Sequence, residues 1–122
     1  MVHPSHTVAL IDDDQSLCRS LGRLLRAAGM ASVSYGSAEA FLADRVPPHF
    51  DCLVLDIRLG GMSGIDLALW LAAEEATAPI IFVTAYDDAE TRARAERAGC
   101  AAYFRKTDSG EEVLEAIRRV SR

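Results

Sequence analysis

Several features are scarce in this 122-residue sequence, and each scarcity argues against a class of protein. The three cysteines form no CxxC pair, which disfavours a disulfide-stabilised secreted fold and a thiolate metal site. No apolar stretch approaches the ~20 residues that cross a bilayer, and the first residues lack the regions of a secretory signal. Basic residues number 13 against 18 acidic ones, and the net charge of −5 disfavours nucleic-acid binding. We therefore expect a cytoplasmic protein that contacts neither membranes nor nucleic acids directly.

The residues that are present suit one globular domain, because half of the chain is hydrophobic and its length fits a single core. Short apolar runs alternate with segments of helical spacing. The runs are Val8–Ile11, Ala31–Tyr35, Cys52–Leu55, Pro79–Val83 and Ala101–Arg105. Runs of this kind suit strands buried on both faces. Five β-α units predict an α/β, flavodoxin-like doubly wound fold: a five-stranded parallel sheet of strand order 2-1-3-4-5, with helices on both faces.

Capping residues mark where the helices between these runs begin. We expect Asp14 to cap the first helix and Ser37 to cap a helix through residue 42, because short polar side chains satisfy the first free N–H groups. Ser109 and a glutamate three residues later form a capping box for the last helix. The large aromatic residues Trp70 and Phe82 lie in apolar segments and are predicted to be core.

Polar residues stand at the ends of four predicted strands. They are Asp12 and Asp13 after the first strand, Asp56 after the third, Thr84 at the end of the fourth and Lys106 after the fifth. The carboxyl ends of parallel strands meet at one edge of the sheet, so we expect these side chains to converge. Each close carboxylate pair costs roughly 1 kcal/mol or more at an effective dielectric constant of about 20. A cation must compensate, and the two candidates are Lys106 and a hard divalent ion such as Mg²⁺.

Such a site is suited to phosphoryl transfer. Asp13 and Asp56, with a backbone carbonyl from the following loop, would leave open positions on Mg²⁺ for phosphate oxygens. The Thr84 hydroxyl and the Lys106 ammonium could bind the oxygens of a phosphoryl group placed on Asp56. Because phosphoryl transfer depends mainly on positioning and charge neutralisation, and a carboxylate is a competent nucleophile, we predict that Asp56 accepts a phosphoryl group.

Four segments of the chain resemble the receiver domains of two-component response regulators. In order they are LIDDDQ, LVLDIRLGGMSG, VTAYD and AGCAAYFRK, and together they extend over essentially the whole chain. The SAEAFLA stretch at residues 37–43 is more similar to the FixJ-type branch than to others. The resemblance implies a single CheY-like receiver domain over residues 1–122, with no output domain within it.

The resemblance also implies a role for individual residues. Asp56 would be the phosphoacceptor, and Asp12 and Asp13 would be the acidic pair that holds Mg²⁺ together with Asp56. The main-chain carbonyl of Arg58 would be a further protein ligand of the metal.

Three other residues would detect the phosphoryl group, again by resemblance. Thr84 would be the switch hydroxyl that moves toward the phosphoryl group, and Lys106 would be the ion-pair partner of that group. Tyr103 would be the aromatic side chain whose inward or outward rotamer reports the state. The implied partners are a sensor histidine kinase as donor and a downstream output protein or domain, in phosphorelay signalling and transcription regulation. Dimerisation linked to phosphorylation is a further option. The domain would not be an enzyme beyond catalysing its own phosphorylation and dephosphorylation.

The sequence departs from the family at two places. Thr107 stands where receivers usually have proline after the lysine, which leaves the direction of Lys106 open. Gly60 and Gly61 replace the usual proline of the turn after Asp56 and are predicted to loosen that loop. Arg58 and Tyr86 lie two residues past site residues and are expected to affect the lifetime of the aspartyl phosphate. We therefore predict slower or weaker phosphorylation than in a typical receiver.

Two other functions stay open from the sequence. One is a receiver-fold interaction module that works without phosphorylation. The other is a phosphatase with an aspartate nucleophile, since Asp12-x-Asp14 after a strand also resembles haloacid-dehalogenase-type enzymes. That family needs another acidic pair and usually a cap insertion, for which this sequence has no room.

Overall fold

The computed structural model describes residues 6–85 and 87–121, and within them strands and helices alternate strictly. The elements are β1 (Thr7–Ile11), α1 (Gln15–Ala27), β2 (Ala31–Tyr35), α2 (Ala38–Ala43), β3 (Cys52–Leu55), α3 (Gly64–Ala73), β4 (Ile80–Thr84), α4 (Ala89–Arg97), β5 (Ala102–Arg105) and α5 (Gly110–Val120). The strands pair in parallel in the order β2-β1-β3-β4-β5. The predicted doubly wound α/β fold is therefore confirmed. Tyr86, which carried a prediction on phosphoryl lifetime, lies outside the described residues.

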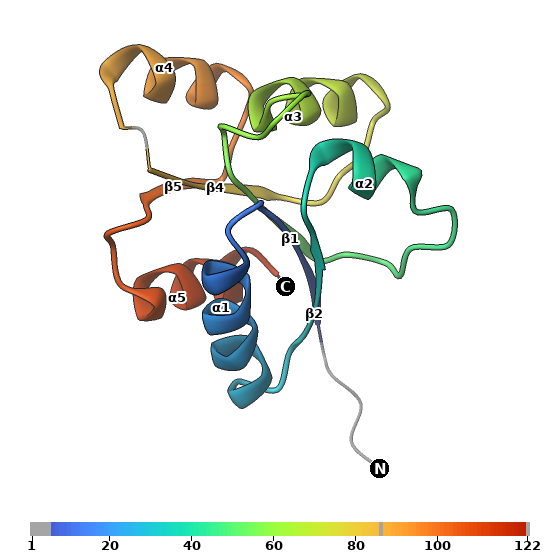
Figure 1. Ribbon diagram of the computed structural model, residues 1–122, viewed down its shortest axis with the longest axis vertical. Helices are drawn as coiled ribbons and strands as arrows, with labels where there is room; N and C mark the ends of the chain where they lie inside the picture. Colours follow the sequence, from blue (N-terminus) through green and yellow to red (C-terminus); the bar gives the residue numbers. More distant parts are fainter. Residues whose placement is uncertain (1–5, 86, 122) are drawn as a thin grey trace.

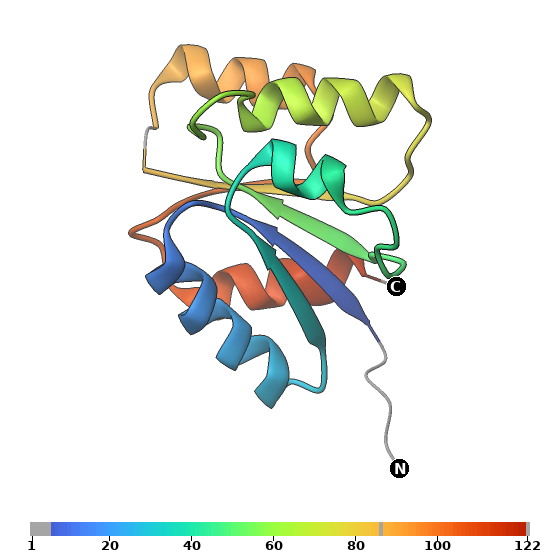
Figure 2. The ribbon, with the colours of Figure 1, turned by 45° about the vertical axis from the view of Figure 1, so that its right-hand side comes forward.

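The sheet is the middle of three layers. Helices α1 and α5 cover one face, and α2, α3 and α4 cover the other (Figures 1 and 2). Because successive side chains of a strand point to opposite faces, Ile81 of β4 belongs to the core beneath α1 and α5, whereas Phe82 belongs to the core beneath α2–α4. Both strands β3 and β4 are buried along their whole length, as the continuous apolar runs predict.

The predicted helix caps are confirmed. Asp14, Ser37 and Ser109 each precede a helix, and the side-chain oxygen of each accepts the backbone N–H three residues later. Two further caps of the same kind, Ser63 and Asp88, begin α3 and α4. Each cap fixes the residue at which a helix begins, and so sets the length of the loop that connects it to the carboxyl end of the preceding strand.

The prediction that Trp70 belongs to the core is wrong. The Trp70 side chain is 44% exposed, whereas Phe82 is fully buried, as predicted. Helix α3 is apolar almost all round, and Leu67 and Leu71 occupy its inner face. Trp70 and its neighbour Leu69 are left on the outer face, because a helix without a polar side gives no signal of which side is buried.

The carboxyl ends of the strands lie at one edge of the sheet, opposite the amino ends. The strand register aligns Ile11 of β1 with Leu55 of β3, and Leu55 with Phe82 of β4. The winding direction reverses between β1 and β3, which is where ligands bind in sheets of this type.

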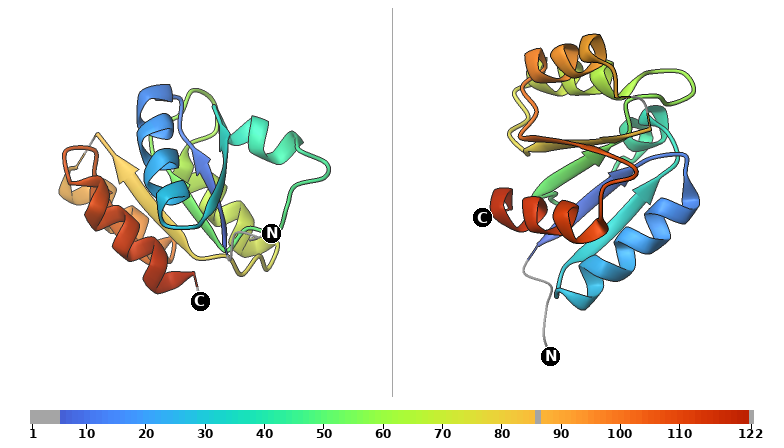
Figure 3. Two further views of the ribbon diagram at one scale, coloured as in Figure 1. Left: turned by 90° about the horizontal axis from the view of Figure 1, so that it is seen from below. Right: turned by 90° about the vertical axis from the view of Figure 1, so that its left-hand side faces the viewer.

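Helices α1 and α5 lie side by side beneath this sheet (Figure 3). None of the helices in the described ranges is long and apolar enough to cross a membrane.

Candidate functional site

Three carboxylates meet at the reversal point between β1 and β3. Asp12, Asp13 and Asp56 each place one oxygen so that the three atoms lie within 4.8 Å of one another. Asp12 and Asp56 are buried, with 6% and 5% of their surface exposed, while Asp13 is exposed to solvent. The backbone fixes both buried residues: the Asp12 N–H donates to the Tyr35 carbonyl, and the Asp56 N–H donates to Ile11, each over 3.0 Å. The sheet itself therefore positions the acidic cluster.

The environment of Asp12 disfavours its charge. Burial, and then the charge of Asp56, raise the pKa of Asp12 to about 6, against the opposing effects of the Asp14 N–H group and Lys106. The Asp14 N–H donates to Asp12 Oδ1 over 2.9 Å. The cluster thus holds more negative charge than its protein surroundings fully stabilise, which favours binding of a cation.

Lys106 bridges the two buried carboxylates. Its Nζ lies 3.1 Å from Asp56 Oδ2 and 3.2 Å from Asp12 Oδ1, with Asp14 Oδ2 farther away at 3.7 Å. Burial alone would lower the pKa of Lys106, but hydrogen bonds to Asp56 and Asp12, and their charges, outweigh it and raise the pKa. Lys106 is therefore a permanent cation at neutral pH, positioned against the carboxylate of Asp56.

The backbone around Lys106 settles the direction of its side chain. The Lys106 N–H donates to the carbonyl of Thr84 over 2.8 Å, which continues the pairing of β4 and β5 one residue beyond β5. No peptide bond among the described residues is cis, so the linkage to Thr107 is trans. Thr107 does not turn the lysine away from the site.

The loop from Ile57 to Ser63 closes over Asp56. The Arg58 N–H donates to Asp56 Oδ1 over 3.3 Å, so each carboxylate oxygen of Asp56 has a defined donor. At the end of the loop the Gly64 N–H donates to the Ile57 carbonyl over 2.9 Å. A Cβ at Gly64 would lie 2.0 Å from the Asp56 carbonyl oxygen, so this close return of the chain requires glycine. The backbone of Arg58 is thus held beside the acidic cluster.

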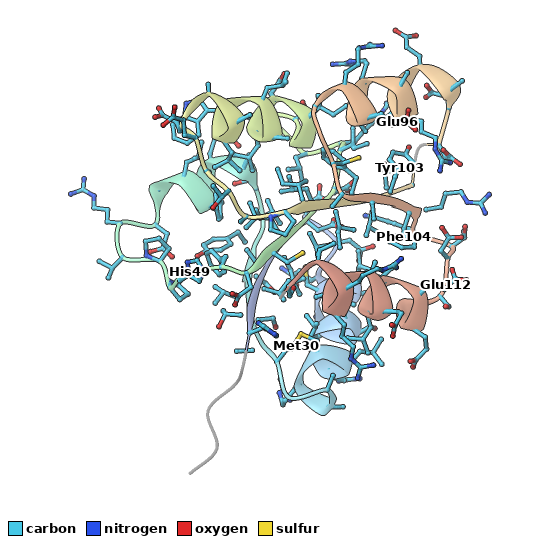
Figure 4. The ribbon with its side chains drawn as sticks, turned by 180° about the vertical axis from the view of Figure 1, so that it is seen from behind. Met30, His49, Glu96, Tyr103, Phe104 and Glu112 are labelled. Carbon is cyan, nitrogen blue, oxygen red and sulfur yellow. The ribbon has the colours of Figure 1, made fainter. Side chains whose placement is uncertain are left out.

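Thr84 and Tyr103 occupy neighbouring strands at this edge. Thr84 is fully buried at the end of β4 and is aligned with Arg105 of β5. Tyr103 lies on the α4 side of β5, with Phe104 on the α5 side (Figure 4). The Arg92 guanidinium lies 5.0 Å from the centre of the Tyr103 ring, a cation-π distance. Burial, and then the charge of Asp87 and a hydrogen bond to it, raise the pKa of Tyr103.

One contact near the site was not predicted from the sequence. Glu39 of α2 accepts a hydrogen bond from the backbone N–H of Met62, with 2.8 Å between Oε2 and N. The two residues are 23 positions apart, and no sequence pattern links a helix glutamate to a distant backbone N–H. Glu39 therefore contacts the loop that follows Asp56. It lies near the site in addition to the strand-end residues that the sequence predicts.

The donor set at this edge fits a hard divalent cation. Asp12, Asp13 and Asp56 offer oxygen ligands from one side of a cluster that is open to solvent at Asp13. Mg²⁺ prefers one or two carboxylates with several remaining positions for water or phosphate oxygens. Lys106 lies on the same carboxylates, and together these residues can neutralise an anionic group placed on Asp56.

Comparison with known proteins shows similarity over nearly the whole chain. A family model described as the response regulator receiver domain matches residues 8–118. The chain is 38% identical to nodulation protein W of Bradyrhizobium diazoefficiens, with 90% of this chain and 48% of that protein covered. It is 33% identical to the transcriptional regulatory protein FixJ of Rhizobium meliloti, with 95% of this chain and 57% of that protein covered. The chain spans about half the length of such curated relatives.

Solved structures resemble the chain equally well. The crystal structure of FixJ-N superposes with a TM-score of 0.85 at 32% identity, covering 96% of this chain and 94% of that one. The non-phosphorylated HemR receiver domain from Leptospira biflexa gives a TM-score of 0.86 at 28% identity, with the same coverage. The similarity thus includes all the strands whose ends form the acidic site.

Proposed function

This chain belongs to the response regulator receiver domain family, and from that premise we propose that it is a phosphoacceptor module of a two-component system. In this proposal Asp56 takes a phosphoryl group from the phosphohistidine of a sensor histidine kinase. The observation that carries the proposal is the position of Asp56, whose carboxylate contacts the ammonium of Lys106 and clusters with the carboxylates of Asp12 and Asp13.

The transfer step needs a carboxylate nucleophile and a place for the phosphoryl charge. An oxygen of Asp56 attacks phosphorus, an O–P bond forms and the N–P bond of the donor breaks, leaving the bonding electrons on the imidazole nitrogen. Lys106, 3.1 Å from Asp56 Oδ2, can then pair with a phosphoryl oxygen, and the Thr84 hydroxyl can donate to another. Bound Mg²⁺ supplies further neutralisation of the phosphoryl oxygens.

Mg²⁺ would be held by Asp12, Asp13 and Asp56, with the Arg58 main-chain carbonyl as a further ligand. The three carboxylate oxygens support this assignment because they already lie within 4.8 Å of one another. The carbonyl of Arg58 lies in the loop whose N–H group contacts Asp56. A phosphoryl group would also compete with Asp12 for Lys106, which now contacts both buried carboxylates.

The signal would leave the domain through β5 and its neighbouring helices. Thr84 and Lys106 flank β5, and Tyr103 lies between that strand and α4. We propose that phosphorylation moves these residues and alters the face that binds an output domain or protein, and that this response controls transcription, in line with the name of the FixJ relative. A second copy of the domain is a further partner for that face. In this proposal the domain acts in the cytoplasm and catalyses only its own phosphorylation and dephosphorylation.

The test is phosphorylation by acetyl phosphate with Mg²⁺, followed by intact mass spectrometry. We expect one added phosphoryl mass on the wild type, none in Asp56→Asn and none when EDTA removes the metal. No addition to the wild type, or undiminished addition to Asp56→Asn, would refute the proposal. Sustained turnover of p-nitrophenyl phosphate would instead indicate a phosphatase, and unchanged partner binding by Asp56→Asn would indicate a module that works without phosphorylation.

A further inference from the structure

The loop that follows the phosphoacceptor is attached to α2, although its two glycines predict a loose segment. Gly61 has a φ of +86°, a conformation that favours glycine. The next residue, Met62, donates its N–H to Glu39 Oε2 over 2.8 Å. A Cβ at Gly61 would lie 2.5 Å from that same oxygen and 3.1 Å from the Glu39 Cδ. Glycine at position 61 therefore makes room for the Glu39 carboxylate against the loop.

We propose that Glu39 is a positioning residue for phosphorylation: its carboxylate holds the loop over residues 57–63 in the shape that the metal and Asp56 require. The inference rests on the proposed function of Asp56. Glu39 touches neither the phosphoryl group nor the metal in this proposal, and acts through the backbone of the loop.

A short series of contacts connects Glu39 to the reacting group. At the near end of the loop the Arg58 N–H donates to Asp56 Oδ1 over 3.3 Å. At the far end Gly64 returns to within van der Waals contact of the Asp56 backbone and donates its N–H to Ile57 over 2.9 Å. Both ends are therefore fixed at Asp56, and Gly60 and Gly61 in the middle of the loop project into solvent. Glu39 holds this projecting part through Met62.

A carboxylate suits this position on α2. Residue 39 lies in the first turn of the helix, where the free N–H groups favour negative charge. The hydrogen bond from the Met62 backbone holds the pKa of the exposed Glu39 carboxyl below its usual range, so the side chain is charged at neutral pH. A hydrogen bond to a charged acceptor is shorter and stronger than one to a neutral acceptor, which suits a single contact that must hold a glycine-containing loop.

Three substitutions at position 39 distinguish the effect of side-chain length from the effect of side-chain charge. Glu39→Gln keeps the length and an acceptor oxygen, Glu39→Asp keeps the charge but is one methylene shorter, and Glu39→Ala removes both. Glu39→Gln keeps the contact through a neutral oxygen that accepts a weaker hydrogen bond, so we expect it to lower Mg²⁺ affinity by only about twofold in isothermal titration. Glu39→Asp and Glu39→Ala should weaken it by about three- to tenfold, the effect of one lost hydrogen bond. Glu74→Ala, which removes an exposed carboxylate at the end of α3, is the matched control.

A rescue experiment distinguishes positioning from a general loss of folding. Gly60 has no positive φ and no atoms within 4 Å of a Cβ, so alanine is tolerated there and stiffens the loop by another route. We expect Gly60→Ala to restore part of the Mg²⁺ affinity and of the acetyl phosphate reaction in Glu39→Ala, while urea unfolding changes little. Absence of rescue would overturn the positioning role, as would wild-type Mg²⁺ affinity in Glu39→Ala.

The outcomes also separate this inference from the proposed function. A phosphorylated wild type with an equally active Glu39→Ala variant refutes the inference alone. A wild type that binds Mg²⁺ through a Glu39-dependent loop but accepts no phosphoryl group refutes the proposed function and leaves the loop contact standing. A wild type that binds no Mg²⁺ overturns both.

Discussion

Replacing Asp12 with asparagine is expected to stabilise the protein when no metal is present. Asp12 is buried beside Asp56, and its pKa is raised from 3.8 to about 6. At ~1.36 kcal/mol per pH unit, that difference corresponds to at most about 3 kcal/mol of unfolding free energy at neutral pH. Asparagine keeps an Oδ1 acceptor for the Asp14 N–H and for Lys106 Nζ, which now lie 2.9 Å and 3.2 Å from Asp12 Oδ1. The substitution therefore removes mainly the unfavourable charge.

The sign of the effect follows from which state binds the proton more tightly. The folded protein holds the Asp12 proton up to about pH 6, whereas the unfolded chain releases it near 3.8. Wild-type stability due to this group is therefore highest below pH 4, falls between pH 4 and 6, and stays low above pH 7. The Asp12→Asn variant has no carboxyl group at this position, so its stability does not fall in this pH range for this reason. Its advantage should be near zero at pH 4 and grow to at most about 3 kcal/mol by pH 8.

Urea unfolding in EDTA at pH values from 4 to 8 measures this difference. Glu74→Gln is the control, since Glu74 is an exposed carboxylate and its variant should follow the wild type at every pH. Added Mg²⁺ should stabilise the wild type and reverse the order of the two proteins, because a ligand that binds only the folded state adds RT ln(1 + [L]/Kd). Equal stability of Asp12→Asn and wild type at pH 8, or a difference that is largest at pH 4, would refute the reasoning.

Three further predictions concern other parts of the structure and are tested by urea unfolding. Lys106→Met leaves the two buried carboxylates without their cation, and should cost about 3 kcal/mol at pH 8 and less at pH 5, where a carboxylate can be protonated. Gly64→Ala places a methyl group against the carbonyl of the phosphoacceptor and should cost about 2–3 kcal/mol, whereas Gly60→Ala, with open space at its Cβ, should cost less than about 1 kcal/mol. Trp70→Ala should cost less than about 2 kcal/mol because the side chain is nearly half exposed, against about 3–5 kcal/mol for Phe82→Ala in the core.

The convergence of the site residues could be predicted from the sequence because it depends on topology alone. Once β1, β3, β4 and β5 are recognised as parallel strands of one sheet, the residues that follow them must meet at one edge. The distances confirm this for Asp56, Asp12 and Lys106, whose charged atoms lie within 3.2 Å of a partner. Asp12 is buried and Asp13 is exposed, although both contribute an oxygen to the cluster, because Asp13 lies in the bend that follows β1.

Two features that depend on contacts outside the strands could not be predicted. The exposed position of Trp70 depends on which side of an apolar helix faces the sheet, and helical periodicity cannot show this when nearly every position is apolar. The contact between Glu39 and Met62 depends on the path of a glycine-containing loop, which many backbone conformations would satisfy. In both cases the sequence identifies the side chain but does not show which residues it contacts in the fold.

The Lys106 side chain reaches the acidic site although Thr107 replaces the proline that usually follows this lysine in the family. Thr107 follows the lysine, but the position of Lys106 is determined on its other side, by the hydrogen bond from its N–H to the Thr84 carbonyl. Its flexible side chain then reaches the carboxylates of Asp56 and Asp12, whose charge attracts the ammonium whichever residue follows. Any effect of Thr107 on phosphorylation must therefore act on how the segment after β5 moves, and not on whether the lysine reaches Asp56.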